Sequence, residues 1–172
     1  LLMLAGNIFA PLNLEGDMWL GGDNLDEKLV DFAIASIKED HGIDPATNLR
    51  FMAELKKAAQ AAKERLSAGK SADLIVTGML RDATDNLIDV TLEITREDFE
   101  RMILPLVGTY RQCSCGQANV ESDDACAKCG KSLRGTAPRD GKALLIVKKG
   151  LENANQSVET VDFVLMAGNS TM

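Results

Sequence analysis

The sequence lacks an apolar run long enough to cross a membrane, since none approaches the roughly 18 residues that a spanning helix needs. Residues 1–4 are apolar, but they have neither the basic stretch nor the small-residue cleavage site of a signal peptide. No internal repeat divides the 172 residues, so we expect one domain, or one domain with a small insert. The chain does not begin with Met, and we expect it to be a piece of a longer protein that has no membrane partner.

Positive charge and histidine are also scarce. The chain has 19 Lys and Arg against 26 Asp and Glu, and this net charge of −7 disfavours nonspecific binding to nucleic acid or to an anionic membrane. Hydrophobic residues make up 45% of the chain, which is enough for a core, so disorder is not expected. The single histidine, His41, is expected near the C-terminus of a helix, where a role beside the helix dipole is favoured over catalysis.

Cysteine is absent outside one short window. The four cysteines are arranged as Cys113-x-Cys115, ten intervening residues, and Cys126-x-x-Cys129, with a glycine after each pair. A disulfide scaffold would distribute its cysteines along the chain, whereas clustering favours a metal site and a reducing, cytoplasmic compartment. Four thiolates satisfy a tetrahedral zinc ion, and they leave no open position for catalysis. We therefore predict a structural zinc ribbon; two disulfides or four free thiols are the alternatives.

The cysteine window does not have the composition of a nucleic-acid-binding ribbon. Residues 111–134 contain four basic and three acidic side chains, so no phosphate-neutralising patch is evident. No aromatic residue is available there for stacking on bases. No nucleic-acid partner is expected.

Apolar spacing and turn residues predict a series of short elements around this window. These elements predict an α+β fold, in which a small antiparallel sheet packs with several helices. A lobe at residues 1–110 and 136–172 would carry the zinc-ribbon insert at 111–135. The expected elements are a hairpin within 1–14, helices at 23–42, 47–68, 95–107 and 142–154, strands at 72–80 and 87–94, and a buried strand at 161–167.

Four segments outside the cysteine window resemble, in the same order, segments of the DnaK-type heat-shock chaperones. The resemblance implies the outer part of lobe II of an actin-like ATPase domain, which grips the adenine and ribose of ATP or ADP from one side. The segments are WLGGDNLD at 19–26, LKKAAQAAKERLS at 55–67, ITREDFE at 94–100 and VLMAGNSTM at 164–172.

The resemblance also implies which residues would contact the nucleotide. Four of them follow the spacing i, i+3, i+4 and i+7, so they share one polar face of the expected helix. The alternatives are that this face is merely solvated and that the glycines only form turns. The implied residues are Gly21, Gly22, Gln60, Lys63, Glu64, Ser67, Gly168, Asn169 and Ser170.

The chain departs from the family pattern within this set. Gln60 stands where the family has a glutamate that bonds the ribose hydroxyls, and Glu64 stands where an arginine often stacks on adenine. Asn169 replaces a glycine, and Met172 replaces an arginine that helps to sandwich the base. An amide bonds a hydroxyl more weakly than a carboxylate does, so weakened or altered nucleotide use is expected.

Hydrolysis is not expected from this chain alone, although the parent protein would be an ATPase chaperone. The phosphate loops, magnesium ligands and lysine that phosphoryl transfer needs are not found here. The expected partners are the rest of the parent chain and a nucleotide-exchange factor or co-chaperone. In the alternative function, the zinc ribbon is a protein-interaction module with little or no nucleotide binding.

Overall fold

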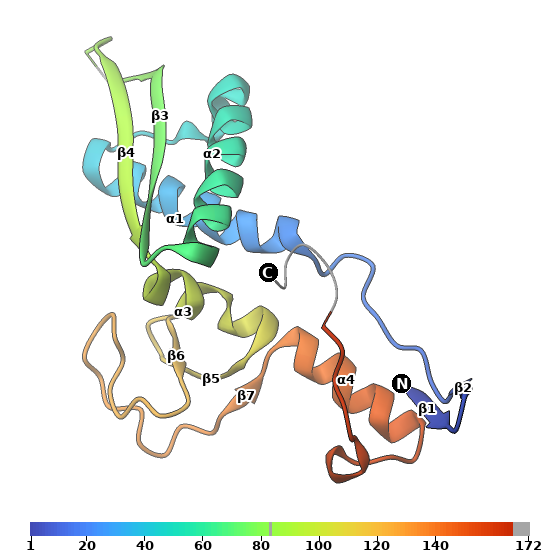
Figure 1. The fold of residues 1–172 in the computed structure, drawn as a ribbon. Coiled ribbons are helices and arrows are strands. Elements are labelled where there is room, and N and C mark those ends of the chain that lie inside the picture. The colour runs from blue at the N-terminus through green and yellow to red at the C-terminus, as the bar shows by residue number, and fades with distance from the viewer. Residues whose placement is uncertain (83, 167–172) are drawn as a thin grey trace. The chain divides into compact units, whose positions relative to one another are not determined.

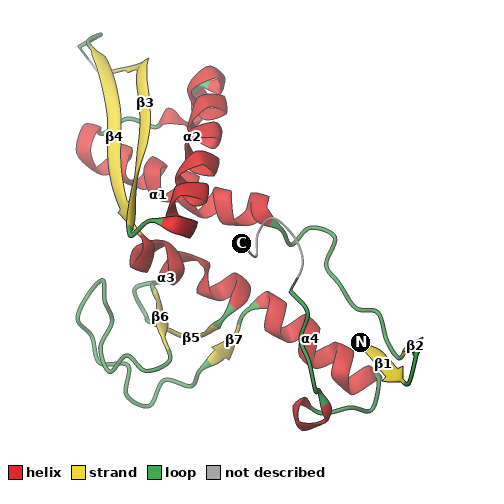
Figure 2. Ribbon diagram, viewed as in Figure 1, coloured by secondary structure: helices red, strands yellow, loops and turns green. Residues whose placement is uncertain are grey.

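The structure, a computed structural model, describes residues 1–82 and 84–166 (Figure 1). The described chain forms two compact units. One is residues 21–102, and the other combines residues 1–20 with the described residues from 103 onward. Helices and small antiparallel sheets account for the regular structure, which confirms the α+β class (Figure 2). None of the described helices combines the length and apolar character needed to span a membrane.

Residues 21–102 form a unit of two long helices and a long β-hairpin. The two strands are antiparallel and pair from Ser71 with Thr95 to Arg81 with Leu87, with an irregularity between Val76 and Leu80. The predicted elements are confirmed, with boundaries shifted by at most two residues. They are α1 (Gly22–His41), α2 (Leu49–Ala68), β3 (Ser71–Arg81), β4 (Leu87–Thr95) and the beginning of α3 (Arg96–Val107).

One apolar core holds this unit together. In β3, alternate residues from Ala72 to Val76 are buried, as expected for a strand with one covered face. The helices contribute apolar stripes at helical spacing, and β4 contributes two more residues. The buried stripes are Leu29, Ala33 and Ile37 of α1, Phe51, Leu55, Ala59, Ala62 and Leu66 of α2, and Val90 and Ile94 of β4.

Side chains and a glycine fix where the helices begin and end. Asn48 caps α2 by accepting a hydrogen bond from the amide of Phe51 (3.1 Å), and the Thr95 hydroxyl accepts one from the amide of Asp98 (3.1 Å) at the start of α3. Helix α1 ends at His41, and Gly42 adopts the left-handed conformation (φ 67°) that closes many helices.

The other unit contains a hairpin, a three-stranded sheet and one long helix. The hairpin pairs β1 with β2 around a turn at Gly6 and Asn7, as predicted. In the sheet, β5 is central and pairs antiparallel with β6 and β7. Its elements are β1 (Leu2–Ala5), β2 (Ile8–Pro11), β5 (Thr109–Gln112), β6 (Ala118–Val120), β7 (Arg139–Asp140) and α4 (Lys142–Asn153).

The cysteine segment enters and leaves this unit through a narrow neck. Strand β5 follows the end of α3, and β7 precedes α4, so their pairing brings the two ends of the segment together. The amide of Gly141 donates to the carbonyl of Gly108 (2.7 Å). A Cβ at Gly141 would lie 2.6 Å from the Leu104 carbonyl oxygen, so only glycine fits at this crossing.

The predicted buried strand at 161–167 is wrong for its described part. Residues 161–166 form no strand, and four consecutive apolar side chains are exposed, from Phe163 (87%) to Met166 (74%). The apolar composition led to the prediction, but no strand of the described residues pairs with this segment. Residue 167 lies outside the described residues.

Candidate functional site

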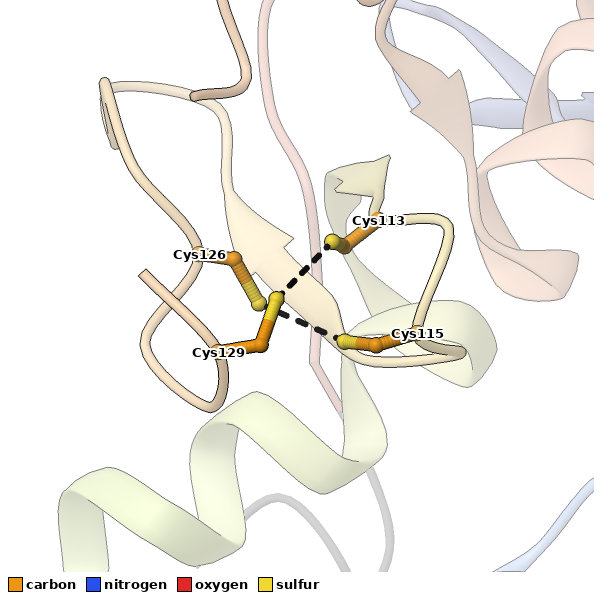
Figure 3. A group of neighbouring side chains, drawn as sticks. All are labelled: Cys113, Cys115, Cys126 and Cys129. Atoms are coloured by element: carbon orange, nitrogen blue, oxygen red, sulfur yellow. Dashed lines mark hydrogen bonds between the residues drawn. The ribbon is translucent and has the colours of Figure 1, made fainter. Parts of the chain in front are cut away.

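The four cysteine side chains converge on one point (Figure 3). Their sulfur atoms all lie within 4.8 Å of one another, and two pairs, Cys113 with Cys129 and Cys115 with Cys126, are 3.6 Å apart. A disulfide requires a sulfur–sulfur distance of about 2.05 Å, so all four are free thiols. A zinc ion about 2.3 Å from each of four tetrahedral ligands requires sulfurs about 3.8 Å apart, which these distances fit.

Tight turns present the sulfurs on both sides of the cluster. The amide of Gly116 donates to the Cys113 carbonyl (3.0 Å), and the amide of Gly130 donates to the Cys126 carbonyl (2.9 Å). Both glycines have positive φ, 92° and 70° respectively. A side chain would be strained in this left-handed conformation, so the glycine after each cysteine pair has a structural reason.

Half of the cluster is buried. Cys113 and Cys126 are buried together with Leu133, whereas Cys115 and Cys129 are exposed. Burial opposes ionisation of Cys126, but hydrogen bonds from the amides of Cys129 and Lys128 and from neighbouring thiols outweigh it and lower the pKa of Cys126 to about 6.

The pKa of Cys129 shifts in the opposite direction. A hydrogen bond from the amide of Lys131 favours its thiolate, but partial desolvation and the three neighbouring sulfurs together raise the pKa of Cys129 to about 11. Negative charges on sulfurs this close to one another repel, which opposes ionisation of all four thiols. A divalent ion would remove this conflict, since it binds thiolates and releases their protons.

The second candidate site lies on the unit formed by residues 21–102. The Lys63 ammonium of α2 lies 3.2 Å from the Gly22 carbonyl oxygen and 2.7 Å from a carboxylate oxygen of Asp26. Asp26 is only 3% exposed. Lys63 therefore ties the double-glycine turn to α2, and the structure brings these two predicted segments together.

The other predicted residues of α2 surround Lys63 on an accessible face. The amide of Gln60 donates to the Glu64 carboxylate (3.3 Å), and the Ser67 hydroxyl donates to the Glu64 carbonyl (2.5 Å). All three side chains are exposed. The predicted residues Gly168, Asn169 and Ser170 lie outside the described residues.

Sequence reasoning missed Asp26, the buried partner of Lys63. A signal for it was present in the sequence, because Asp26, Leu29, Ala33 and Ile37 follow helical spacing along one buried stripe of α1. An acid within an apolar stripe needs a partner of opposite charge, and Lys63 provides it.

Comparison with known proteins decides the family. The family model described as "Hsp70 protein" matches residues 1–123, which is most of the chain. The chain belongs to the Hsp70 family. Three of the four segments that predicted this lie within the matched residues; the fourth, residues 164–172, lies beyond them. The Hsp70 match ends between the two cysteine pairs.

Two Hsp70 relatives show how the chain compares in length. It is 33% identical over 126 residues to "Chaperone protein DnaK" of Mycoplasma mobile, and this aligned region covers 72% of this chain and 21% of that protein. It is 31% identical over 99 residues to "Chaperone protein DnaK" of Burkholderia cenocepacia, which covers 58% of this chain and 15% of that protein. The chain thus spans about a fifth or less of the length of these Hsp70 relatives.

Proposed function

We propose that this chain is the outer part of lobe II of an Hsp70 ATPase domain, and that it contributes the adenine and ribose side of an ATP site. The observation that carries the proposal is the contact of Lys63 with Gly22 and Asp26. This contact fixes the double-glycine turn beside the polar face of α2, so backbone and side-chain groups can bind one ligand together.

The groups on this face suit a nucleoside. Gln60 and Glu64 offer amide and carboxylate groups that can bond ribose hydroxyls. Apart from its chain neighbours, no atom of the described residues lies within 4 Å of the position that a Cβ would occupy on Gly21, so a ligand can approach the backbone there. Without an arginine at position 64, stacking on adenine is lost, and binding by this chain alone is expected to be weak.

Amide NMR spectra of the 172-residue chain titrated with ADP test this proposal. Shifts are expected at residues 21–22 and 60–67, and Gln60→Ala should reduce them. Lys57→Ala is the matched control, since Lys57 is an exposed residue of the same helix that pairs with Glu54. Shifts at other residues only, or equal shifts in the Gln60 variant, would refute the proposal. Robust ATP turnover by the chain alone would also refute it, because the chain is proposed to need the rest of its parent for hydrolysis.

We also propose that the four cysteines bind one structural zinc ion, in a chaperone that works in the reducing cytoplasm. The donor set and the sulfur distances fit a closed tetrahedral site with no open position for a reactant. Elemental analysis should find about one zinc per chain. A chain purified under reducing conditions that retains no zinc and cannot be loaded with it would refute this proposal.

A second candidate function is a ribbon that recruits a protein partner, such as an exchange factor or co-chaperone. The neck at Gly108 and Gly141 favours it, because a segment that enters and leaves at one point can be removed without separating α3 from α4. A chain lacking residues 111–135 should keep its folded 21–102 unit and lose capture of a purified exchange factor. Unchanged capture would reject this function.

A further inference from the structure

We infer that Asn119 is a positioning residue for the metal site: its buried amide locks the two cysteine pairs together and thereby sets the affinity for zinc. The inference rests on the proposed zinc site. Asn119 is a polar residue that is 0% exposed, and it lies on β6, outside both cysteine pairs.

Both polar atoms of the Asn119 side chain are satisfied, each by a different side of the ribbon. Its oxygen accepts a hydrogen bond from the amide of Ala127 (2.9 Å), which lies between Cys126 and Cys129. Its nitrogen donates to the carbonyl of Gln117 (3.0 Å), just after the first cysteine pair. The side chain therefore bridges the strand that follows one pair and the turn that contains the other.

This bridge controls the distances that matter for a metal. The two sulfur contacts at 3.6 Å, Cys113 with Cys129 and Cys115 with Cys126, each join one cysteine pair to the other. A bond that fixes the position of Ala127 relative to β6 also fixes these distances before any ion arrives. Leu133 covers the buried sulfurs, but an apolar contact is not directional and does not define the separation as a hydrogen bond does.

The hydrogen bonds of the buried Asn119 side chain explain why an apolar residue could not replace it. Without the Asn119 side chain, the Ala127 amide loses the part-buried hydrogen bond that ties it to β6, and an apolar side chain offers no acceptor in its place. The ion would then have to order the second turn as it binds. Loss of a residue that orients metal ligands typically weakens metal binding by about 10- to 100-fold.

Zinc affinity in competition with a chromophoric chelator tests the inference on the full 172-residue chain. Asn119→Ala is expected to weaken zinc binding by about 10- to 100-fold, with cobalt spectra that still report four sulfur ligands. Gln112→Ala is the matched control. This variant loses the hydrogen bond from the Gln112 side chain to the Gly116 carbonyl, a bond that lies within the first turn and does not join the two cysteine pairs. Its zinc affinity should stay within about twofold of that of the unsubstituted chain.

Hydrogen exchange of the zinc-loaded variants separates positioning from general support of folding. In Asn119→Ala, the Ala127 amide should lose protection, while the Cys126 amide, bonded to the Lys131 carbonyl, should keep it. Unchanged zinc affinity, or loss of protection across the whole ribbon, would overturn the inference. Failure of the unsubstituted chain to bind zinc would instead overturn the zinc proposal itself.

Discussion

The helix–hairpin unit at residues 21–102 and the ribbon, taken together with its flanking strands as residues 109–140, are ordered by different forces. The helix–hairpin unit buries apolar stripes from two helices and two strands, and its polar side chains lie mostly at its surface. The ribbon buries little more than two cysteines, Leu133, Ala118 and Asn119. So small an apolar core cannot offset the conformational entropy of its chain, and the ribbon must depend on other bonds.

Removal of the proposed zinc ion should have the largest effect and should act on the ribbon alone. Structural zinc sites supply about 10–16 kcal/mol of apparent binding free energy at neutral pH. Chelation, or Cys126→Ser, is therefore expected to abolish amide protection at residues 113–133 and leave residues 21–102 protected. Ser114→Ala is the control, because Ser114 is exposed and lies between two ligands without being one. Equal loss of protection in both regions would contradict the comparison.

A cavity in the apolar core should destabilise residues 21–102 and leave the ribbon unaffected. Leu55 is 0% exposed, and Leu55→Ala is expected to cost about 2–5 kcal/mol of unfolding free energy in residues 21–102. Leu49 belongs to the same helix but is 81% exposed, so Leu49→Ala should change stability little. Urea unfolding followed by helix signal measures both changes. Zinc affinity that fell with Leu55→Ala would show that the two regions are not independent.

Substitution of Lys63 tests whether its ion pair with Asp26 contributes to the stability of residues 21–102. Lys63→Ala leaves the buried Asp26 carboxylate without its partner, at an expected cost of about 1–3 kcal/mol. Lys57→Ala breaks an exposed pair with Glu54 and should cost less than about 1 kcal/mol. Replacing both partners, with Asp26→Leu and Lys63→Met, should restore part of the loss. Thermal unfolding of the three variants measures this, and equal losses for Lys63→Ala and Lys57→Ala would contradict it.

The smallest effect is expected at the turn between β3 and β4. Hydrogen bonds from the Thr84 hydroxyl, the Asn86 and Thr84 amides and the Asn86 side chain outweigh desolvation and lower the pKa of Asp82 to about 2. This is below the value of about 3.9 for an unfolded chain. Its contribution to stability is thus present above pH 4 and lost as the pH falls toward 2. Asp82→Asn should flatten this part of the pH profile of thermal unfolding; an unchanged profile would contradict the assignment.

The sequence predicted most of the elements because local rules govern them. Helices α1 and α2 have strong apolar spacing and clear end signals, and the cysteine spacing by itself indicates one cluster that could hold a metal. Contacts between distant residues could not be predicted this way. The pairing of Lys63 with Asp26 and the bridge made by Asn119 depend on how the elements pack.

The error at residues 161–166 has the same origin. An apolar run of this length predicts a buried strand only if another strand is available to pair with it, and composition does not report a partner. Four exposed apolar side chains in the described part of this segment show the consequence.

The glycine neck also bears on how freely the length of the cysteine segment could change. Because β5 and β7 start and finish at adjacent backbone points, the length of the excursion between them does not alter the path from α3 to α4. A longer or shorter segment would therefore leave the connection from α3 to α4 in place. At the crossing itself, Gly141 leaves no room for a side chain, so shape complementarity constrains this residue independently of whatever the ribbon contacts.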